Sequence, residues 1–184
     1  RSRLVARQIR QAGEDAIFAP TPPLEALRST ESLATTDFVG RPDHVRDPMS
    51  DQRTRISAVD ISRAYFDATT DEDKATYVAL LAKDPDHRSK CGLLRKHMYG
   101  TRAAADGWQQ EYSGFMKSIG LLQGQACPCL FVHVGCALAV GVHCDDFTTA
   151  GAKCELDWLE DQLESKHDFN KEADRGLAAR TRWN

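Results

Sequence analysis

The sequence predicts an α+β fold built on an antiparallel sheet. Short β-rich runs and amphipathic stretches both occur along the 184 residues, but they do not alternate as they do in folds with a parallel sheet. Three β-rich runs follow one another between residues 129 and 151 with short connections, which is the pattern of antiparallel hairpins. Hydrophobic residues make up 41% of the chain, so a sizeable core can form.

The first strand of this sheet is expected at residues 55–61. Before it, residues 20–50 are rich in proline, glycine and aspartate, which predicts loops around one short helix, Leu24–Thr35. Residues 55–61 have the small and β-branched side chains of a buried strand, with Asp60 near its end. For residues 75–83 the apolar spacing fits a strand and a helix equally, and both remain open.

Two amphipathic helices are predicted in the second half of the chain. The first covers residues 103–119 and ends near Gly120, because its large apolar side chains fall on one face: Trp108, Tyr112, Phe115, Met116 and Ile119. We assign Trp108 to packing. The second covers residues 152–166, with an acidic outer face and three apolar positions: Leu156, Leu159 and Leu163.

Two adjacent carboxylates, Asp145 and Asp146, end an apolar run and are expected at a hairpin tip. Neighbouring carboxylates repel each other, so the pair is costly unless solvent or a cation lies opposite. If the strand ending near Asp60 is a neighbour, three acids meet at one place. Hard divalent cations prefer oxygen ligands, and two such ions about 3.5 to 4 Å apart can support phosphoryl transfer.

Charge is unevenly distributed, although the net charge is only −3. The first ten residues contain four arginines and no acid, and residues 87–105 contain five lysines and arginines and no acid. Residues 154–174 contain eight acids and two lysines. The basic segments indicate contact with phosphates, whereas ordinary solvated faces are the alternative explanation.

The chain has no apolar run of membrane-spanning length and no signal peptide, so we expect an intracellular protein without a membrane partner. It begins with arginine, and we expect it to be a piece of a longer protein. Because no secretory signal is present, its six cysteines are expected to be reduced. A zinc-stabilised interaction module is an alternative, although C-x-C spacing lacks the tight turn of C-x-x-C; its ligands would come from Cys127, Cys129, His133, Cys136, His143 and Cys144.

Five blocks, in this order, resemble the reverse transcriptase domain of copia-type retrotransposon polyproteins: "ARQIRQAGEDAIFAPTPPLEALRS", "AVDISRAYFDA", "GLLRKHMYGTRAAADGWQQEYSGFMKSIGL", "PCLFVHV" and "VGVHCDDFTTAG". The resemblance extends from about residue 1 to about residue 169. It implies partial fingers at 1–50, a polymerase palm at 51–169 and a truncated tail at 170–184, with the thumb absent or truncated.

The resemblance also implies an active site with two Mg²⁺ ions, with Mn²⁺ as the alternative ion. Asp60 matches the family's first aspartate, and Asp145 and Asp146 match its paired aspartates. Asp60 and Asp145 would be the main ligands, supported by Asp146 and by the backbone carbonyl of Ile61. Tyr65 matches the aromatic position beneath the sugar of the incoming nucleotide, although a core aromatic is the alternative.

Basic residues are assigned by the same resemblance. Arg3 and Arg7 would contact the triphosphate or the template backbone, where the planar guanidinium suits phosphate. A duplex phosphate track would be formed by Arg88, Lys90, Arg95, Lys96 and Arg102. For each of these side chains, simple surface charge is the alternative.

The implied function is RNA-directed DNA polymerase, acting on an RNA or DNA template with a primer and on dNTPs, together with other segments of the same polyprotein. It would work in a cytoplasmic particle or in the nucleus. The chain departs from the family at Ala103 and Ala105, where glutamine and proline are usual, and at His143, where tyrosine is usual. The alternative is a catalytically inactive, degenerate fragment that keeps the fold and binds nucleic acid.

Overall fold

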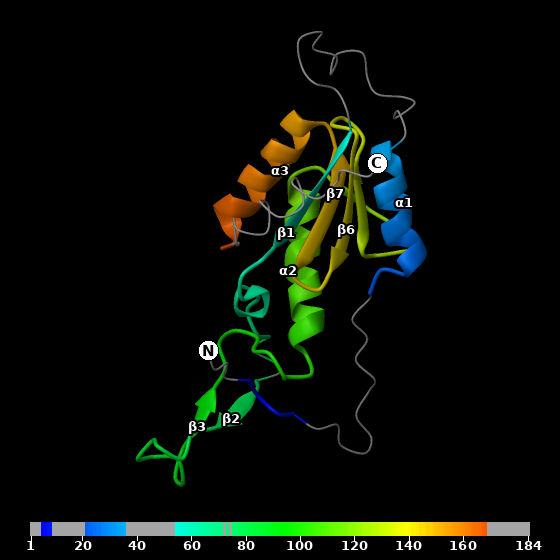
Figure 1. The fold of residues 1–184 in the computed structure, drawn as a ribbon. Helices are drawn as coiled ribbons and strands as arrows, with labels where there is room; N and C mark the ends of the chain where they lie inside the picture. The colour runs from blue at the N-terminus through cyan, green and yellow to red at the C-terminus, as the bar shows by residue number, and fades with distance from the viewer. Residues whose placement is uncertain (1–4, 9–20, 36–53, 72, 74, 169–184) are drawn as a thin grey trace, which may run out of the picture. The chain divides into compact units, whose positions relative to one another are not determined.

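The computed structural model describes residues 5–8, 21–35, 54–71, 73 and 75–168. It is a mixed α+β structure with an antiparallel sheet and three α-helices in these residues, which confirms the predicted class (Figure 1). The chain forms two compact units that interleave along the sequence. Unit 1 comprises residues 1–19 and 63–112, and unit 2 comprises residues 20–62 and 113–184.

Unit 2 is built on a five-stranded sheet with the order β1-β7-β6-β5-β4. All neighbouring strands are antiparallel, so β1 pairs with the last strand of the sequence rather than with the next one. The strands are β1 (Arg55–Asp60), β4 (Leu122–Gln123), β5 (Leu130–His133), β6 (Leu138–His143) and β7 (Asp146–Gly151).

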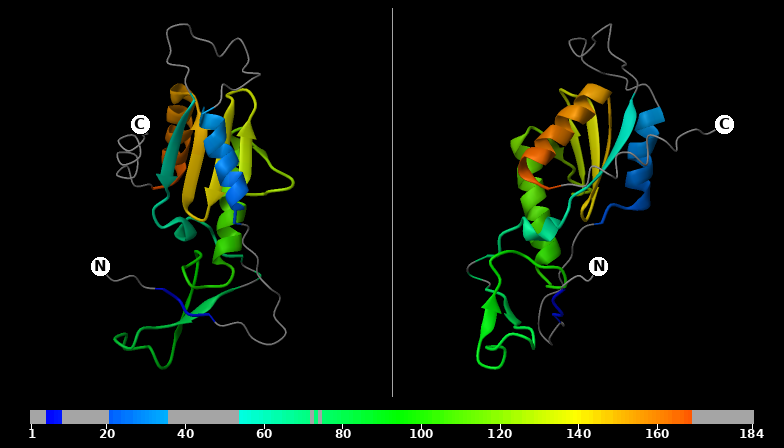
Figure 2. Two further views of the ribbon diagram at one scale, coloured as in Figure 1. Left: turned by 45° about the vertical axis from the view of Figure 1, so that its right-hand side comes forward. Right: turned by 60° about the vertical axis from the view of Figure 1, so that its left-hand side comes forward.

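Helices cover both faces of this sheet (Figure 2). Helix α1 (Leu24–Thr35) lies against one face, where a side chain at Gly141 would meet Leu27 and Thr30. Helix α3 (Lys153–Lys166) lies against the other face and buries three leucines there: Leu156, Leu159 and Leu163. Because side chains alternate along a strand, apolar residues of β6 and β7 form the core beneath α3: Leu138, Val140, Val142 and Phe147.

Unit 1 contains a small two-stranded sheet, β2 (Tyr77–Ala79) with β3 (Cys91–Leu93), and a short 3₁₀ helix, Ala64–Phe66. The segment of residues 5–8 is tied to the residues before α2. The Ala6 amide donates to the Tyr99 carbonyl at 2.8 Å, and the Gln8 amide donates to the Gly100 carbonyl at 3.2 Å. Helix α2 (Ala104–Ser118) contains residues of both units.

Most predicted elements are confirmed. The helix Leu24–Thr35 is present, and so are the helices expected at 103–119 and 152–166, the strand expected at 55–61 and the three β-rich runs expected between residues 129 and 151. The ambiguous segment 75–83 contains a strand, β2. β3 and β4 were not predicted, because three and two residues are too few to show alternation. Among the helices of the described residues, none is long and apolar enough to cross a membrane.

Replacing Gly100 with alanine should break the contact between residues 5–8 and residues 99–100. Gly100 has a φ of 86°, and an alanine Cβ there would lie 1.8 Å from the Ala6 carbonyl oxygen. We expect the free energy of unfolding in urea to fall by about 1–3 kcal/mol. Hydrogen exchange at the Ala6 and Gln8 amides should become faster.

The matched control is Gly114→Ala in α2. Apart from the chain neighbours and the backbone of its own helix, no described atom lies within 4 Å of the ideal Cβ position there, so this change should be neutral or raise stability by up to about 1 kcal/mol. A Gly100→Ala protein as stable as the wild type would contradict the observed close approach.

Candidate active site

The candidate site lies where β6 turns into β7. His143 pairs with Asp146, so only Cys144 and Asp145 form the loop of this hairpin. Cys144 has a φ of 58°, whereas Asp145 is not among the residues with positive φ. This combination of signs fits a type II′ turn, whose first loop residue is normally glycine. A cysteine in this conformation is therefore strained, and such strain clusters at functional sites.

β1 brings the third carboxylate to this turn. The Ile61 amide donates to the Asp145 carbonyl at 2.9 Å, and Asp60 is the register partner of Asp146. In an antiparallel ladder, the pair beside a hydrogen-bonded pair is a non-hydrogen-bonded one, with Cα atoms about 4.5 Å apart. Side chains directly opposite each other lie on the same face. The sheet therefore brings Asp60, Asp145 and Asp146 together at one corner, beside the buried Ile61.

At this corner, burial and neighbouring carboxylates disfavour the negative charge of Asp146. The pKa of Asp146 is raised, first by burial and then by the neighbouring carboxylates of Asp145 and Asp60. His143, next to the turn, acts in the opposite direction. The site therefore gains from a positive charge placed against it.

The carboxylates are neighbours but do not converge. Within the described residues, no three His, Cys, Asp or Glu side chains are arranged to hold a metal ion. This applies to the three aspartates and to the alternative zinc set as well. In that set, burial and Cys127 raise the pKa of the Cys129 thiol to about 11, and burial and Glu155 raise that of Cys136 to about 11.

The candidates for nucleotide binding lie in unit 1. Tyr65, in the 3₁₀ helix, is half-buried against Tyr99, with ring centroids 4.4 Å apart. Arg7 is exposed and belongs to the segment that is bonded to Tyr99 and Gly100. Tyr99 thus contacts Tyr65 and the segment that carries Arg7, and no local pattern in the sequence singles it out. Arg3 lies outside the described residues.

The residues of the predicted phosphate track are mostly exposed, with Arg102 half-buried. Arg88 and Arg95 are exposed, and two others are engaged within the protein. Lys90 forms an ion pair with Asp86 at 2.7 Å, and Lys96 donates to the Asp67 carbonyl at 2.8 Å. Exposed pairs of this kind are weak, so phosphates can compete for these lysines.

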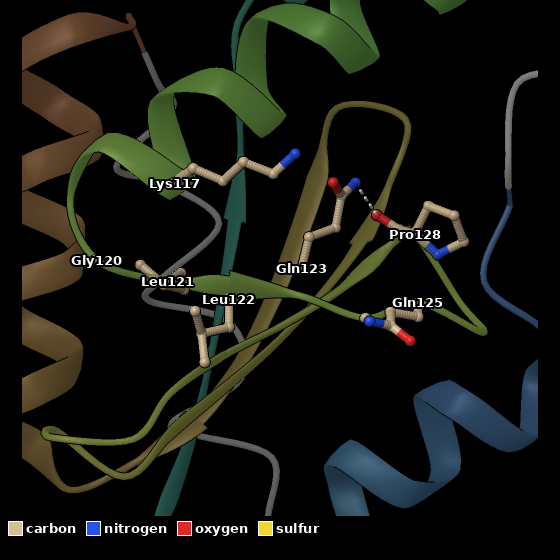
Figure 3. Close-up of a pocket in the computed structure, with 8 residues that line it drawn as sticks. Lys117, Gly120, Leu121, Leu122, Gln123, Gln125 and Pro128 are labelled. Carbon is tan, nitrogen blue, oxygen red and sulfur yellow. Dashed lines mark hydrogen bonds between the residues drawn. The ribbon is translucent and has the colours of Figure 1, made fainter.

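A separate hollow of about 460 Å³ lies beside β4, at the edge of the sheet opposite β1 (Figure 3). Its lining includes Lys117, Leu121, Gln123 and Pro128, and the Gln123 amide donates to the Pro128 carbonyl at 2.8 Å. None of the three aspartates lines it. The hollow is therefore not part of the candidate active site.

Comparisons with known proteins add no assignment: no family model matches the chain, and no curated protein does. The register of β1 against β7 and the chemistry of the residues at that corner are the features that bear on function.

Cys144→Gly should stabilise the protein. Glycine adopts positive φ without the steric cost of about 1–2 kcal/mol that other residues bear. Part of the gain is offset by the flexibility of glycine in the unfolded chain, so we expect about 0.5–1 kcal/mol in urea unfolding. Cys144→Ala is the control, because it removes the thiol and keeps the strain; an equal gain in both variants would refute the strained turn.

Asp146→Asn should raise stability at pH 7. Because the folded-state pKa of Asp146 is raised, the folded protein binds the proton more tightly, and stability is lost as pH rises from 3.8 through the folded pKa. Asparagine does not ionise and avoids this loss. The gain over the wild type, measured by urea unfolding, should disappear below pH 3.8, the ordinary pKa of an aspartate side chain.

The control is Asp161→Asn, an exposed acid on α3, which should show no such pH-dependent gain. A loss of stability in Asp146→Asn at pH 7 would mean that this carboxylate has a net favourable partner.

Proposed function

We propose that this chain is the palm and part of the fingers of a reverse transcriptase of the copia retrotransposon type, an RNA-directed DNA polymerase. The observation that supports it best is the junction of β1 with the β6–β7 hairpin, where the Ile61 amide bonds the Asp145 carbonyl and Asp60 is paired with Asp146. The resemblance requires acids distant in the sequence to be neighbours, and at this junction they are.

The donor set suits two magnesium ions, or manganese. Asp60 and Asp145 would be the main ligands, with Asp146 and the carbonyl of Ile61 in support. Carboxylate and carbonyl oxygens are the ligands that hard divalent cations prefer. Without a cation the three carboxylates repel one another, which accounts for side chains that are adjacent and yet do not converge.

The reaction would join a deoxynucleotide to a primer, by attack of the primer 3′-hydroxyl on the α-phosphate with pyrophosphate as leaving group. Bound metal ions would supply activation of that hydroxyl and stabilisation of the leaving oxygen. The protein's part is positional: the β1–β7 ladder fixes the carboxylates on rigid strands, and proper placement of reacting groups accounts for a large share of such rates.

Residues of unit 1 would bind the other parts of the substrates. Tyr65, supported by Tyr99, would lie beneath the nucleotide sugar, and Arg7 and Arg3 would contact phosphates. The basic residues from Arg88 to Arg102 would follow the phosphates of the template–primer duplex. The remaining segments of the polyprotein, including a thumb, would be needed to hold the duplex during repeated addition.

A catalytically inactive fragment that binds nucleic acid is the second candidate. It is favoured by the departures near the nucleotide site, because Ala103 and Ala105 supply neither an amide nor a rigid ring. His143 beside the turn is a third departure. Under this interpretation the fold and the basic surface persist without nucleotidyl transfer.

Primer extension decides between the two candidates. With the chain joined to the rest of its polyprotein, Mg²⁺, dNTPs and a primed RNA template, we expect extension that Asp145→Asn or Asp60→Asn lowers by roughly a thousandfold. Loss of a metal ligand removes several kcal/mol of transition-state stabilisation. Asp161→Asn is the matched control and should keep full activity.

The outcomes are distinct. Extension that survives both ligand substitutions would refute the two-metal site. A wild-type protein that binds primed template but extends nothing, with either Mg²⁺ or Mn²⁺, would establish the second candidate. A wild-type protein with neither property would refute both.

A further inference from the structure

A second acidic site lies in unit 1, around a buried histidine. A hollow of about 400 Å³ is lined by residues between the 3₁₀ helix and β2, by His97 and by the first turns of α2. The polar groups that matter are Asp71, His97, Asp106, Gln110 and Glu111. None of them belongs to the candidate active site, and the resemblance assigns a role to none of them.

The side chain of His97 is buried at this hollow, and its ring nitrogens have no hydrogen-bond partner among the described residues. The residue is only 8% exposed, and its backbone amide is bonded to the Ala68 carbonyl at 2.9 Å. In the part of the chain that the structure describes, the ring makes no hydrogen bond, although it lines the hollow. The ring fits because residue 107 is glycine: an alanine Cβ there would lie 2.1 Å from Nε2 of His97.

The hollow is negatively charged. Burial lowers the pKa of His97 and the Asp106 carboxylate only partly opposes this, so the ring is neutral at pH 7. Asp106 accepts a long hydrogen bond of 3.4 Å from Gln110, and Asp71 accepts one of 3.1 Å from the Asp73 amide. Among the described residues that line the hollow, none is a lysine or an arginine. The negative charge of the hollow therefore disfavours anions and favours cations.

The acids of this hollow come from two segments of the chain. Asp106 and Glu111 come from α2, whereas Asp71 comes from the segment before β2. A flexible chain with several ammonium groups can reach acids on both segments at once, and each ammonium has three N–H donors.

We propose that this hollow binds a linear polyamine, whose ammonium groups pair with Asp71 and Asp106 while the unused ring nitrogen of His97 accepts a hydrogen bond. Its volume lies within the range of small-molecule sites, and methylene segments would cover the backbone of Gly107 and the side chain of Ala103, which also line it. The proposal does not depend on polymerase activity, because no acid of the candidate active site takes part.

Calorimetric titration of the full chain with spermidine tests the proposal. We expect binding with one site per chain, weakened roughly fivefold by Asp106→Asn and by Asp71→Asn, since each removes one ion pair. Asp161→Asn, an exposed acid of unit 2, should leave the affinity unchanged. Butylamine, which has one ammonium group, should bind at least roughly fivefold more weakly than spermidine.

The pH dependence provides a second readout. Protonation of His97 places a positive charge beside the ligand, so spermidine affinity should fall from pH 8 to pH 5. The charged groups that line the hollow together with His97 are Asp106 and Glu111 of α2 and Asp71 of the segment before β2. In His97→Gln this fall should disappear, because glutamine does not titrate. Circular dichroism at both pH values checks that each variant is folded.

Three results would overturn the proposal. The first is spermidine affinity that Asp71→Asn and Asp106→Asn leave unchanged. The second is equal weakening by Asp161→Asn, which would indicate general counterion attraction. The third is butylamine or Mg²⁺ alone binding as tightly as spermidine, which would mean that a single positive charge fills the site.

Discussion

The hydrogen bond from the Ile61 amide to the Asp145 carbonyl is the interaction on which the candidate site depends. It fixes the register of β1 against β7, and side chains change face with every residue along a strand. A slip of one residue would move Asp60 to the face of the sheet away from Asp146. The register is secured from the other side by the core residues Val59 and Phe147 and by the hydrogen bond from Ser57 to Glu160 of α3. The same strand register thus determines both the packing of the core and the positions of the aspartates.

The same corner violates two local rules. A cysteine occupies a backbone conformation that favours glycine, and carboxylates lie beside each other with their mutual repulsion only partly offset by His143. Neither feature improves folding, because a glycine and a neutral side chain would suit the turn better. Violations that coincide at one place, held by an otherwise consistent sheet, are typical of sites selected for function. His143 offsets part of the repulsion between the carboxylates. The aspartates can therefore be neighbours without a cation, although their side chains are not arranged around a common centre.

The sequence predicted the helices and strands whose apolar residues recur with a clear period. It did not predict the strands that form only because distant segments pair with each other. The helix at 103–119 and the strands of the hairpin have long apolar patterns, and they are present. β3 and β4 have no such pattern, because pairing with a neighbour alone defines them. Pairing of β1 with β7 was required by the resemblance, not by any local signal. The division at residues 50 and 169 stays a prediction about polymerase subdomains, whereas the compact units interleave. The sequence does not single out His97, because only the structure shows that its side chain is buried without a hydrogen-bond partner among the described residues.

The two acidic places in this chain differ in which segments supply their charges, and this difference bears on which cation each would bind. At the sheet corner the acids come from one ladder and from adjacent residues, so small shifts of short side chains would bring their oxygens around the proposed ion. In the hollow beside His97 the acids come from α2 and from the segment before β2. Several ammonium groups on one flexible chain could pair with acids on both of these segments. Conversely, a polyamine at the sheet corner could present only one ammonium to charges so close together. The two proposed sites would therefore select different kinds of cation.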